Sequence, residues 1–145
     1  MPEANEGGCV CGAVRYRVTR APIRTNVCHC TFCQRRTGSA FGFIAYFRQE
    51  DVEITRGVLK SYEHRSDESD RWLRMGFCPT CGTTLTLTVE LLPGALGVAG
   101  GTFDEPSWLK IERHTWARSA HPWLVVPPDV EQFPKGSLQQ PLHIK

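Results

Sequence analysis

Seven cysteines stand in three tight groups, and no other residues of this 145-residue chain carry as much potential chemistry. The groups are Cys9-x-Cys11, Cys28-x-Cys30-x-x-Cys33 and Cys78-x-x-Cys81. Cysteines at these spacings can bind one metal ion through two sulfurs, and the spacings recur in zinc sites. Seven thiolates exceed the four positions of a tetrahedral zinc, so one site cannot use them all. The pattern therefore indicates a metal protein with two sites.

Pairing the two outer groups gives a closed site of four cysteines: Cys9, Cys11, Cys78 and Cys81. Because all four zinc positions are then filled, this site is predicted to be structural, and it would tie together segments that lie 66 residues apart. Two alternatives stay open for the same spacings. One is a thioredoxin-like redox pair, and the other is an iron–sulfur cluster.

The remaining group, Cys28, Cys30 and Cys33, has no fourth cysteine. Three protein ligands and one open position are typical of a catalytic zinc, so these residues are the predicted catalytic site. His29 lies between two of the cysteines and is expected to point away from the metal as an exposed side chain. His114 and His121 are alternative fourth ligands. The group could also be three structural cysteines that hold no metal.

Zinc bound to three thiolates is a weak Lewis acid toward a carbonyl, but it can lower the pKa of a thiol and hold the thiolate ready to attack an electrophile. Arg35 and Arg36 follow Cys33 after one intervening residue, Gln34. They are candidates for pairing with the carboxylates of an anionic thiol, and the alternative is two solvated arginines at a helix end.

The elements that must position these groups are mostly short strands. Apolar residues alternate with polar ones over 14–18 and 84–89, which predicts half-buried strands. Further strands are expected at 41–47, 52–55, 59–62, 72–77 and 97–99, in an antiparallel arrangement. A short helix is predicted from Thr31 to Arg36 and ends near Gly38. Segment 63–71 is expected to be a solvated loop, and the Pro-rich segment 125–145 is expected to be irregular.

Composition indicates one domain, residues 1–145, with its core at about 7–134. The 17 Lys and Arg residues nearly balance the 15 Asp and Glu residues, so no general attraction to nucleic acid is expected. No apolar run of the length of a membrane span occurs. An odd cysteine count after a polar N-terminus predicts a reducing, cytoplasmic location and not a secreted disulfide framework. Oligomeric state stays open.

Six segments of the chain resemble the glutathione-dependent formaldehyde-activating family, also called the CENP-V/GFA family. They are residues 8–16 (GCVCGAVRY), 28–41 (CHCTFCQRRTGSAF), 77–82 (FCPTCG), 101–107 (GTFDEPS), 114–116 (HTW) and 122–123 (PW). Together they extend over roughly residues 7–134. The resemblance implies a mainly β, Mss4-like fold with antiparallel sheets around a structural zinc and little helix. It also implies the structural zinc on the two outer cysteine groups and the catalytic zinc on the middle group.

The activity that the resemblance implies is a carbon–sulfur lyase reaction that forms S-(hydroxymethyl)glutathione from glutathione and formaldehyde. We therefore expect a zinc-dependent enzyme that joins a small thiol to an aldehyde. Asp104 and Glu105 are candidates for proton transfer, and Phe41, Trp72 and Trp116 for lining a pocket, although a turn and core packing explain them equally well. The alternatives are a non-catalytic zinc module that binds a partner and a thiol-responsive zinc-binding protein.

Overall fold

The computed structural model describes residues 4–144, and most of their regular structure is β-strand. The strands are β1 (Asn5–Gly8), β2 (Arg15–Val18), β3 (Arg24–Cys28), β4 (Gly42–Arg48), β5 (Val52–Arg56), β6 (Lys60–Arg65), β7 (Trp72–Phe77), β8 (Thr84–Val89), β9 (Ala95–Ala99), β10 (Arg113–Thr115) and β11 (Glu131–Gln132). The α-helix of this part is α1 (Thr31–Thr37). Four single turns of 3-10 helix complete it: η1 (Gln49–Asp51), η2 (Gly100–Thr102), η3 (Pro106–Trp108) and η4 (Ala117–Ser119). The mainly β prediction is confirmed.

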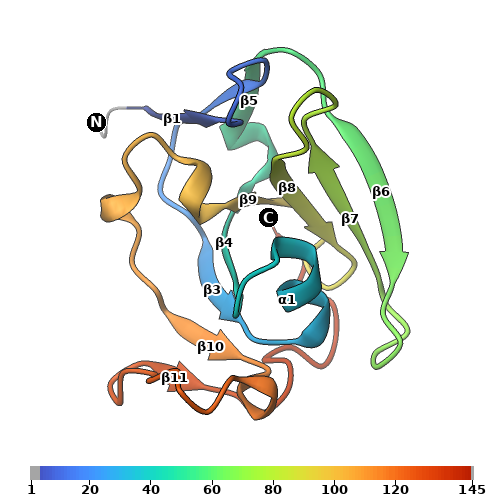
Figure 1. Cartoon of the computed structure of the whole chain (residues 1–145), viewed down its shortest axis with the longest axis vertical. Helices are drawn as coiled ribbons and strands as arrows, with labels where there is room; N and C mark the ends of the chain where they lie inside the picture. Colours follow the sequence, from blue (N-terminus) through green and yellow to red (C-terminus); the bar gives the residue numbers. More distant parts are fainter. Residues whose placement is uncertain (1–3, 145) are drawn as a thin grey trace.

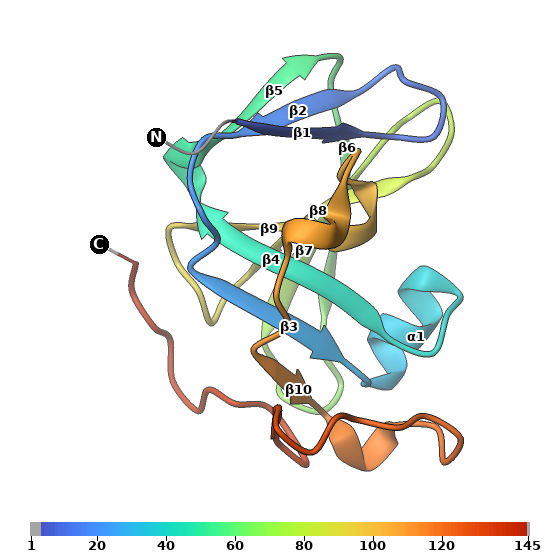
Figure 2. The same ribbon diagram turned by 90° about the vertical axis from the view of Figure 1, so that its left-hand side faces the viewer.

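The strands form two sheets (Figures 1 and 2). A small sheet has the order β1-β2-β5, and a large one has the order β11-β10-β3-β4-β9-β8-β7-β6. Both sheets are antiparallel except at one edge, where β10 pairs in parallel with β3 and with β11. The predicted antiparallel architecture is confirmed for the other strand pairs, and this edge is the exception. Parallel neighbours need a long connection, and here residues 29–112 run between β3 and β10.

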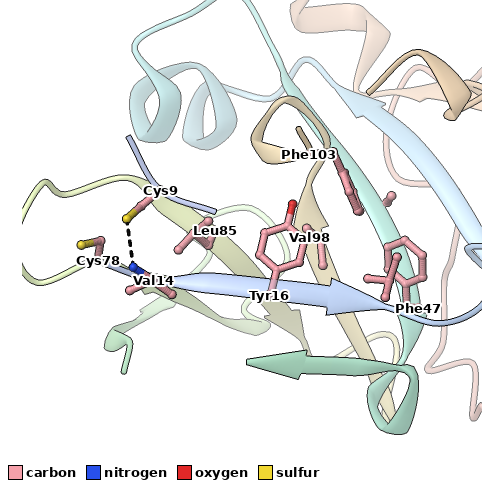
Figure 3. Close-up of a cluster of buried hydrophobic side chains, with 10 residues drawn as sticks. Cys9, Val14, Tyr16, Phe47, Cys78, Leu85, Val98 and Phe103 are labelled. Carbon is pink, nitrogen blue, oxygen red and sulfur yellow. Dashed lines mark hydrogen bonds between the residues drawn. The ribbon is translucent and has the colours of Figure 1, made fainter. Parts of the chain in front are cut away.

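The main core lies between the two sheets (Figure 3). Val14, Tyr16 and Val18 are each 1% exposed, as their alternation predicts. They pack with Phe47, Leu85, Val98 and Phe103, while a second apolar cluster lies on the other face of the large sheet and includes Ile44, Tyr46 and Leu87. β4 therefore contributes to both clusters, which explains why its apolar run is continuous and not alternating.

Several predicted elements occur where the sequence indicated them. β7 and β8 have the predicted bounds, and α1 ends at Gly38, which has a φ of 68°. Segment 63–71 is only partly a loop, because β6 continues to Arg65 before the chain turns. This extension pairs with β7 as far as Trp72, and the exposed cross-strand ion pair Glu63–Arg74 supports it. None of the helices among residues 4–144 has the length and apolar character that crossing a membrane requires.

Candidate functional site

The outer cysteine groups come together as one cluster, which we call the four-cysteine cluster (Cys9, Cys11, Cys78 and Cys81). Its four sulfurs all lie within 4.8 Å of one another. The sulfur of Cys11 is 3.6 Å from that of Cys9 and 3.8 Å from that of Cys78. At a Zn–S distance of about 2.3 Å, two sulfurs of a tetrahedral zinc lie about 3.8 Å apart. The cluster therefore has the dimensions that a tetrahedral metal requires.

Each half of this cluster is the turn of a β-hairpin. The first turn joins β1 to β2, and the second joins β7 to β8. Each turn contains a glycine in the left-handed region, Gly12 with a φ of 80° and Gly82 with a φ of 79°. The Val14 amide donates to the Cys9 sulfur at 3.2 Å (Figure 3), and amides in the second turn donate to the Cys78 sulfur. Backbone donors of this kind stabilise thiolates, the form that binds a metal.

Thr83 favours the ionised form of one exposed ligand of the four-cysteine cluster. Its hydroxyl lies 3.2 Å from the Cys81 sulfur, and its side chain and amide lower the pKa of Cys81 to about 5. The Thr83 hydroxyl also accepts a hydrogen bond from the Val10 amide at 3.1 Å. This contact joins the two hairpin turns, so the cluster connects the small sheet to the large one.

The middle group forms the three-cysteine cluster (Cys28, Cys30 and Cys33), whose sulfurs also lie within 4.8 Å of one another. Cys28 ends β3, Cys30 is the N-cap of α1, and Cys33 lies in the first turn of that helix. The Cys33 amide donates to the Cys30 sulfur at 3.3 Å, so this sulfur serves as a helix cap. Among residues 4–144, no histidine, aspartate or glutamate adds a fourth ligand atom to the group.

The surroundings of Cys33 favour a thiolate. Hydrogen bonds from the thiols of Cys28 and Cys30 lower the pKa of Cys33 well below its usual value, and Arg36 adds to this effect. The Arg36 guanidinium donates to the Cys33 sulfur at 3.9 Å. Contacts with Cys30 and Cys33 raise the pKa of Cys28. The contact with Cys28 lowers the pKa of Cys30, but Cys33 together with burial raises it to about 11, so without a metal only one of the three sulfurs favours the thiolate.

All three cysteines of this cluster line a cavity of about 800 Å³. Its walls come from β3, α1, β8, the turn between β6 and β7, and a stretch of the C-terminal segment. Arg35 lines this cavity, whereas Arg36 does not and instead contacts Cys33. The two neighbouring arginines thus face different parts of the site.

The prediction that His29 is exposed is wrong, because its side chain is 0% exposed. Its Nε2 lies 2.8 Å from Nδ1 of His114, and its ring packs edge-on against Phe41. The alternation of Cys28, His29 and Cys30 directs the histidine to the opposite side from the two sulfurs, but that side is covered by β10 and not by solvent. Burial lowers the pKa of both histidines, and the neighbouring His114 lowers the pKa of His29 further, so the pair is uncharged at neutral pH.

The other candidate residues are divided between the cavity and the rest of the molecule. Trp72 and Trp116 line the cavity. Asp104 instead forms an ion pair with Arg15 of β2, which lowers the pKa of Asp104. The remaining candidates also lie outside the cavity lining: Glu105 accepts a hydrogen bond from Ser107, Phe41 packs on His29, and His121 stacks on Trp123.

Sequence reasoning missed three cationic residues that line the cavity: Arg24, Lys135 and Arg71, the last of which is paired with Glu90. A signal for Arg24 existed, since Arg24, Asn26 and Cys28 have the period of two that places residues on one face of a strand. That signal depends on recognising β3, and β3 was not predicted. Lys135 has no comparable signal, because nothing local places the C-terminal segment beside the cysteines.

Comparison with known proteins agrees with this geometry. Residues 4–119 match the family model described as "Glutathione-dependent formaldehyde-activating enzyme". The chain is 30% identical over 83 residues to a Halomonas elongata protein named "Putative glutathione-dependent formaldehyde-activating enzyme", a match over 55% of this chain and 53% of that protein. The match thus spans about half the length of this relative.

The fold is also similar to that of a solved structure. A crystal structure of a Rhodobacter sphaeroides protein matches with a TM-score of 0.56 and 24% identity, over 73% of this chain and 96% of that one. This likeness concerns the fold alone. Together with the family match over most of its length, the cysteine geometry leads to one conclusion: the chain belongs to the glutathione-dependent formaldehyde-activating family.

Proposed function

We propose that the protein is a zinc-dependent carbon–sulfur lyase or synthase that joins a small thiol, such as glutathione, to formaldehyde or a related aldehyde. In this reaction the thiol sulfur bonds to the carbonyl carbon, the carbonyl π bond breaks, and the thiol proton ends on the oxygen. The observation that carries the proposal is a cluster of three thiols, without a fourth protein ligand among residues 4–144, in the wall of a large cavity.

The two clusters fit zinc in different ways. The four-cysteine cluster offers a complete tetrahedral set, and we assign it a structural metal. The three-cysteine cluster offers three thiolates beside a cavity, and we assign it the catalytic metal. Zinc at such a site supplies an open position at which a thiol loses its proton more readily.

The chain's own residues would then orient the reactants. The Arg36 guanidinium holds the Cys33 sulfur, and the Cys33 amide holds the Cys30 sulfur, so two of the three thiolates have fixed partners. Arg35 brings positive charge to the cavity wall, where it can attract a thiol that carries carboxylates. Among residues 4–144, no acidic or basic side chain beside the sulfurs is marked out as a proton donor, so we assign proton transfer to solvent.

Metal content and turnover together test this proposal. We expect two zinc ions per chain, and faster exchange between isotope-labelled formaldehyde and its glutathione adduct in NMR spectra when the protein is present. Two zinc ions with glutathione-dependent loss of one ion and no acceleration would support the thiol-responsive zinc protein instead. No metal at the three-cysteine cluster would contradict both proposals.

The two neighbouring arginines should respond differently to substitution. Arg35→Gln should weaken binding of an anionic thiol about two- to fivefold and leave an uncharged thiol unaffected, because this exposed side chain supplies long-range attraction. Arg36→Gln should weaken retention of the second zinc about tenfold, since it removes a partner of a ligand sulfur. Calorimetry with the two thiols and titration with a zinc chelator measure these effects. The same response from both variants would contradict the separate roles.

A further inference from the structure

A stretch of the C-terminal segment forms one wall of the cavity that contains the three-cysteine cluster. Residues 135–139 line this cavity, although they lie beyond the range that matches the family model. The stretch is held at both ends, because the Trp116 amide donates to the Lys135 carbonyl at 3.0 Å and the Arg71 guanidinium donates to the Gln139 carbonyl at 2.9 Å. Leu138 packs against the second apolar cluster. The wall is therefore part of the folded structure.

Arg24 stands at the far end of a row that begins at the three-cysteine cluster. Arg24, Asn26 and Cys28 lie on one face of β3, and all three line the cavity. The Arg24 guanidinium donates to the Ser137 hydroxyl at 2.5 Å, so the C-terminal wall orients it. No carboxylate of residues 4–144 forms an ion pair with Arg24. Burial and nearby Arg113 lower the pKa of Arg24, which means that they destabilise its charged form. A bound anion would stabilise this charged form.

The other charges of the cavity leave it with an excess of positive charge. Arg35 and Lys135 also lack an ion-pair partner within the described part of the chain, whereas Glu68 and Glu90 are paired with Arg118 and Arg71. Among the acidic residues that line the cavity, this leaves Asp67 unpaired against three cations. Three thiolates with a zinc dication would add one further negative charge, so the balance stays positive by one. An anionic ligand is therefore favoured over a cationic one.

The length of the row sets the size of that ligand. Arg24 lies four positions before Cys28 in the strand, which corresponds to about 13 Å between their Cα atoms. A tripeptide in extended form spans about 10 Å, so it can reach from the sulfurs to the guanidinium with help from the side chains. A single amino acid with a thiol cannot, because its sulfur and carboxylate lie within one residue.

We propose that Arg24, oriented by Ser137, binds the distal carboxylate of an extended thiol peptide whose sulfur lies at the three-cysteine cluster. Lys135 adds a second cationic contact, which makes the C-terminal wall a determinant of specificity. The identity of the thiol rests on the proposed function. The carboxylate site itself does not, because it can bind a ligand whose sulfur is blocked.

S-methylglutathione tests the carboxylate site without metal chemistry, since it keeps both carboxylates and has no free thiol. Calorimetry should detect its binding to the wild-type protein, and Arg24→Gln should weaken this binding about ten- to hundredfold, as expected for loss of a charge-assisted hydrogen bond. Lys135→Gln should weaken it about two- to fivefold because this side chain is exposed. The diethyl ester of the same compound should bind weakly to the wild type and should no longer distinguish wild type from Arg24→Gln.

Four further variants distinguish a positioning role of Ser137 from a general loss of stability. Ser137→Ala should weaken binding several-fold, and Ser137→Thr, which keeps the hydroxyl, should restore it. Arg48→Gln and Lys60→Gln remove cations outside the cavity lining and should change neither affinity nor melting temperature. Equal binding of acid and ester to the wild type, or unchanged binding by Arg24→Gln, would overturn the inference.

The two proposals can fail separately. Arg24-dependent binding of S-methylglutathione without aldehyde turnover would support the carboxylate site and contradict the proposed enzymatic activity. Turnover of glutathione that Arg24→Gln leaves unchanged would do the reverse.

Discussion

Cys81→Ser is expected to unfold the protein or to lower its melting temperature by more than about 10 °C. The Cys81 side chain is exposed, and serine is close to it in size. Without a metal, the substitution should therefore change the free energy of unfolding by no more than about 0.5 kcal/mol. A structural zinc changes this expectation, because metal binding in small domains contributes on the order of 10 kcal/mol to folding. Loss of one of its ligands can therefore remove much of a typical domain stability of about 5–15 kcal/mol.

Thermal melts and zinc content together measure this effect. Thr80→Ser is the matched control, since it changes an exposed residue of the same turn that is not a ligand, and it should melt like the wild type. A strong chelator should lower the melting temperature of the wild type toward that of Cys81→Ser. If Cys81→Ser melts together with the control and keeps its zinc, the four-cysteine cluster has no structural metal.

Cys30→Ser is expected to abolish thiol-dependent aldehyde turnover and to leave the fold intact. The Cys30 sulfur caps α1 by accepting the Cys33 amide, and a serine hydroxyl accepts such a bond at least as well. The three-cysteine cluster spans only a short stretch of chain, so its loss frees little conformational entropy. What the substitution removes is one of three thiolates, and with it the proposed catalytic metal.

Cys30→Ala provides the comparison, because it removes both the metal ligand and the cap. It should lose turnover in the same way and should also lose about 1 kcal/mol of stability. Melting curves, zinc content and aldehyde consumption on both variants separate the two roles of this sulfur. Full activity in Cys30→Ser would contradict a catalytic role of the three-cysteine cluster. A melting temperature as low as that of Cys81→Ser would indicate that this cluster has a structural role instead.

The cysteine clusters were predictable because their information is local. Two or three sulfurs within six residues must lie close together. The two outer groups pair because zinc in a structural site has four ligands and each group supplies two. Strands such as β2 and β8 were predictable for the same reason, since alternation is a property of neighbouring residues. Here the sequence pattern and the tertiary structure favour the same conformation.

β3 was missed because the polar residues on one of its faces are directed into a cavity. Polar Arg24 and Asn26 alternate there with Thr25 and Val27, which are 2% and 3% exposed, so a single strongly apolar residue marks the buried face. His29 was misjudged for a related reason, because its cover comes from β10, which pairs with β3 but lies far from it in the sequence. Such contacts depend on residues more than 80 positions away, and no local pattern reports them.

The position of the four-cysteine cluster at two hairpin turns has a consequence for the order of folding. The first turn is synthesised early, but its metal partner follows 66 residues later. Until then the first hairpin, which is too small to be stable alone in water, can pair with β5 but lacks the part of its core that β8 and β9 supply. Closing so long a loop slows folding, and a metal captured by both turns would hold it closed. Zinc supply would then govern how quickly new chains mature, as well as how stable the finished protein is.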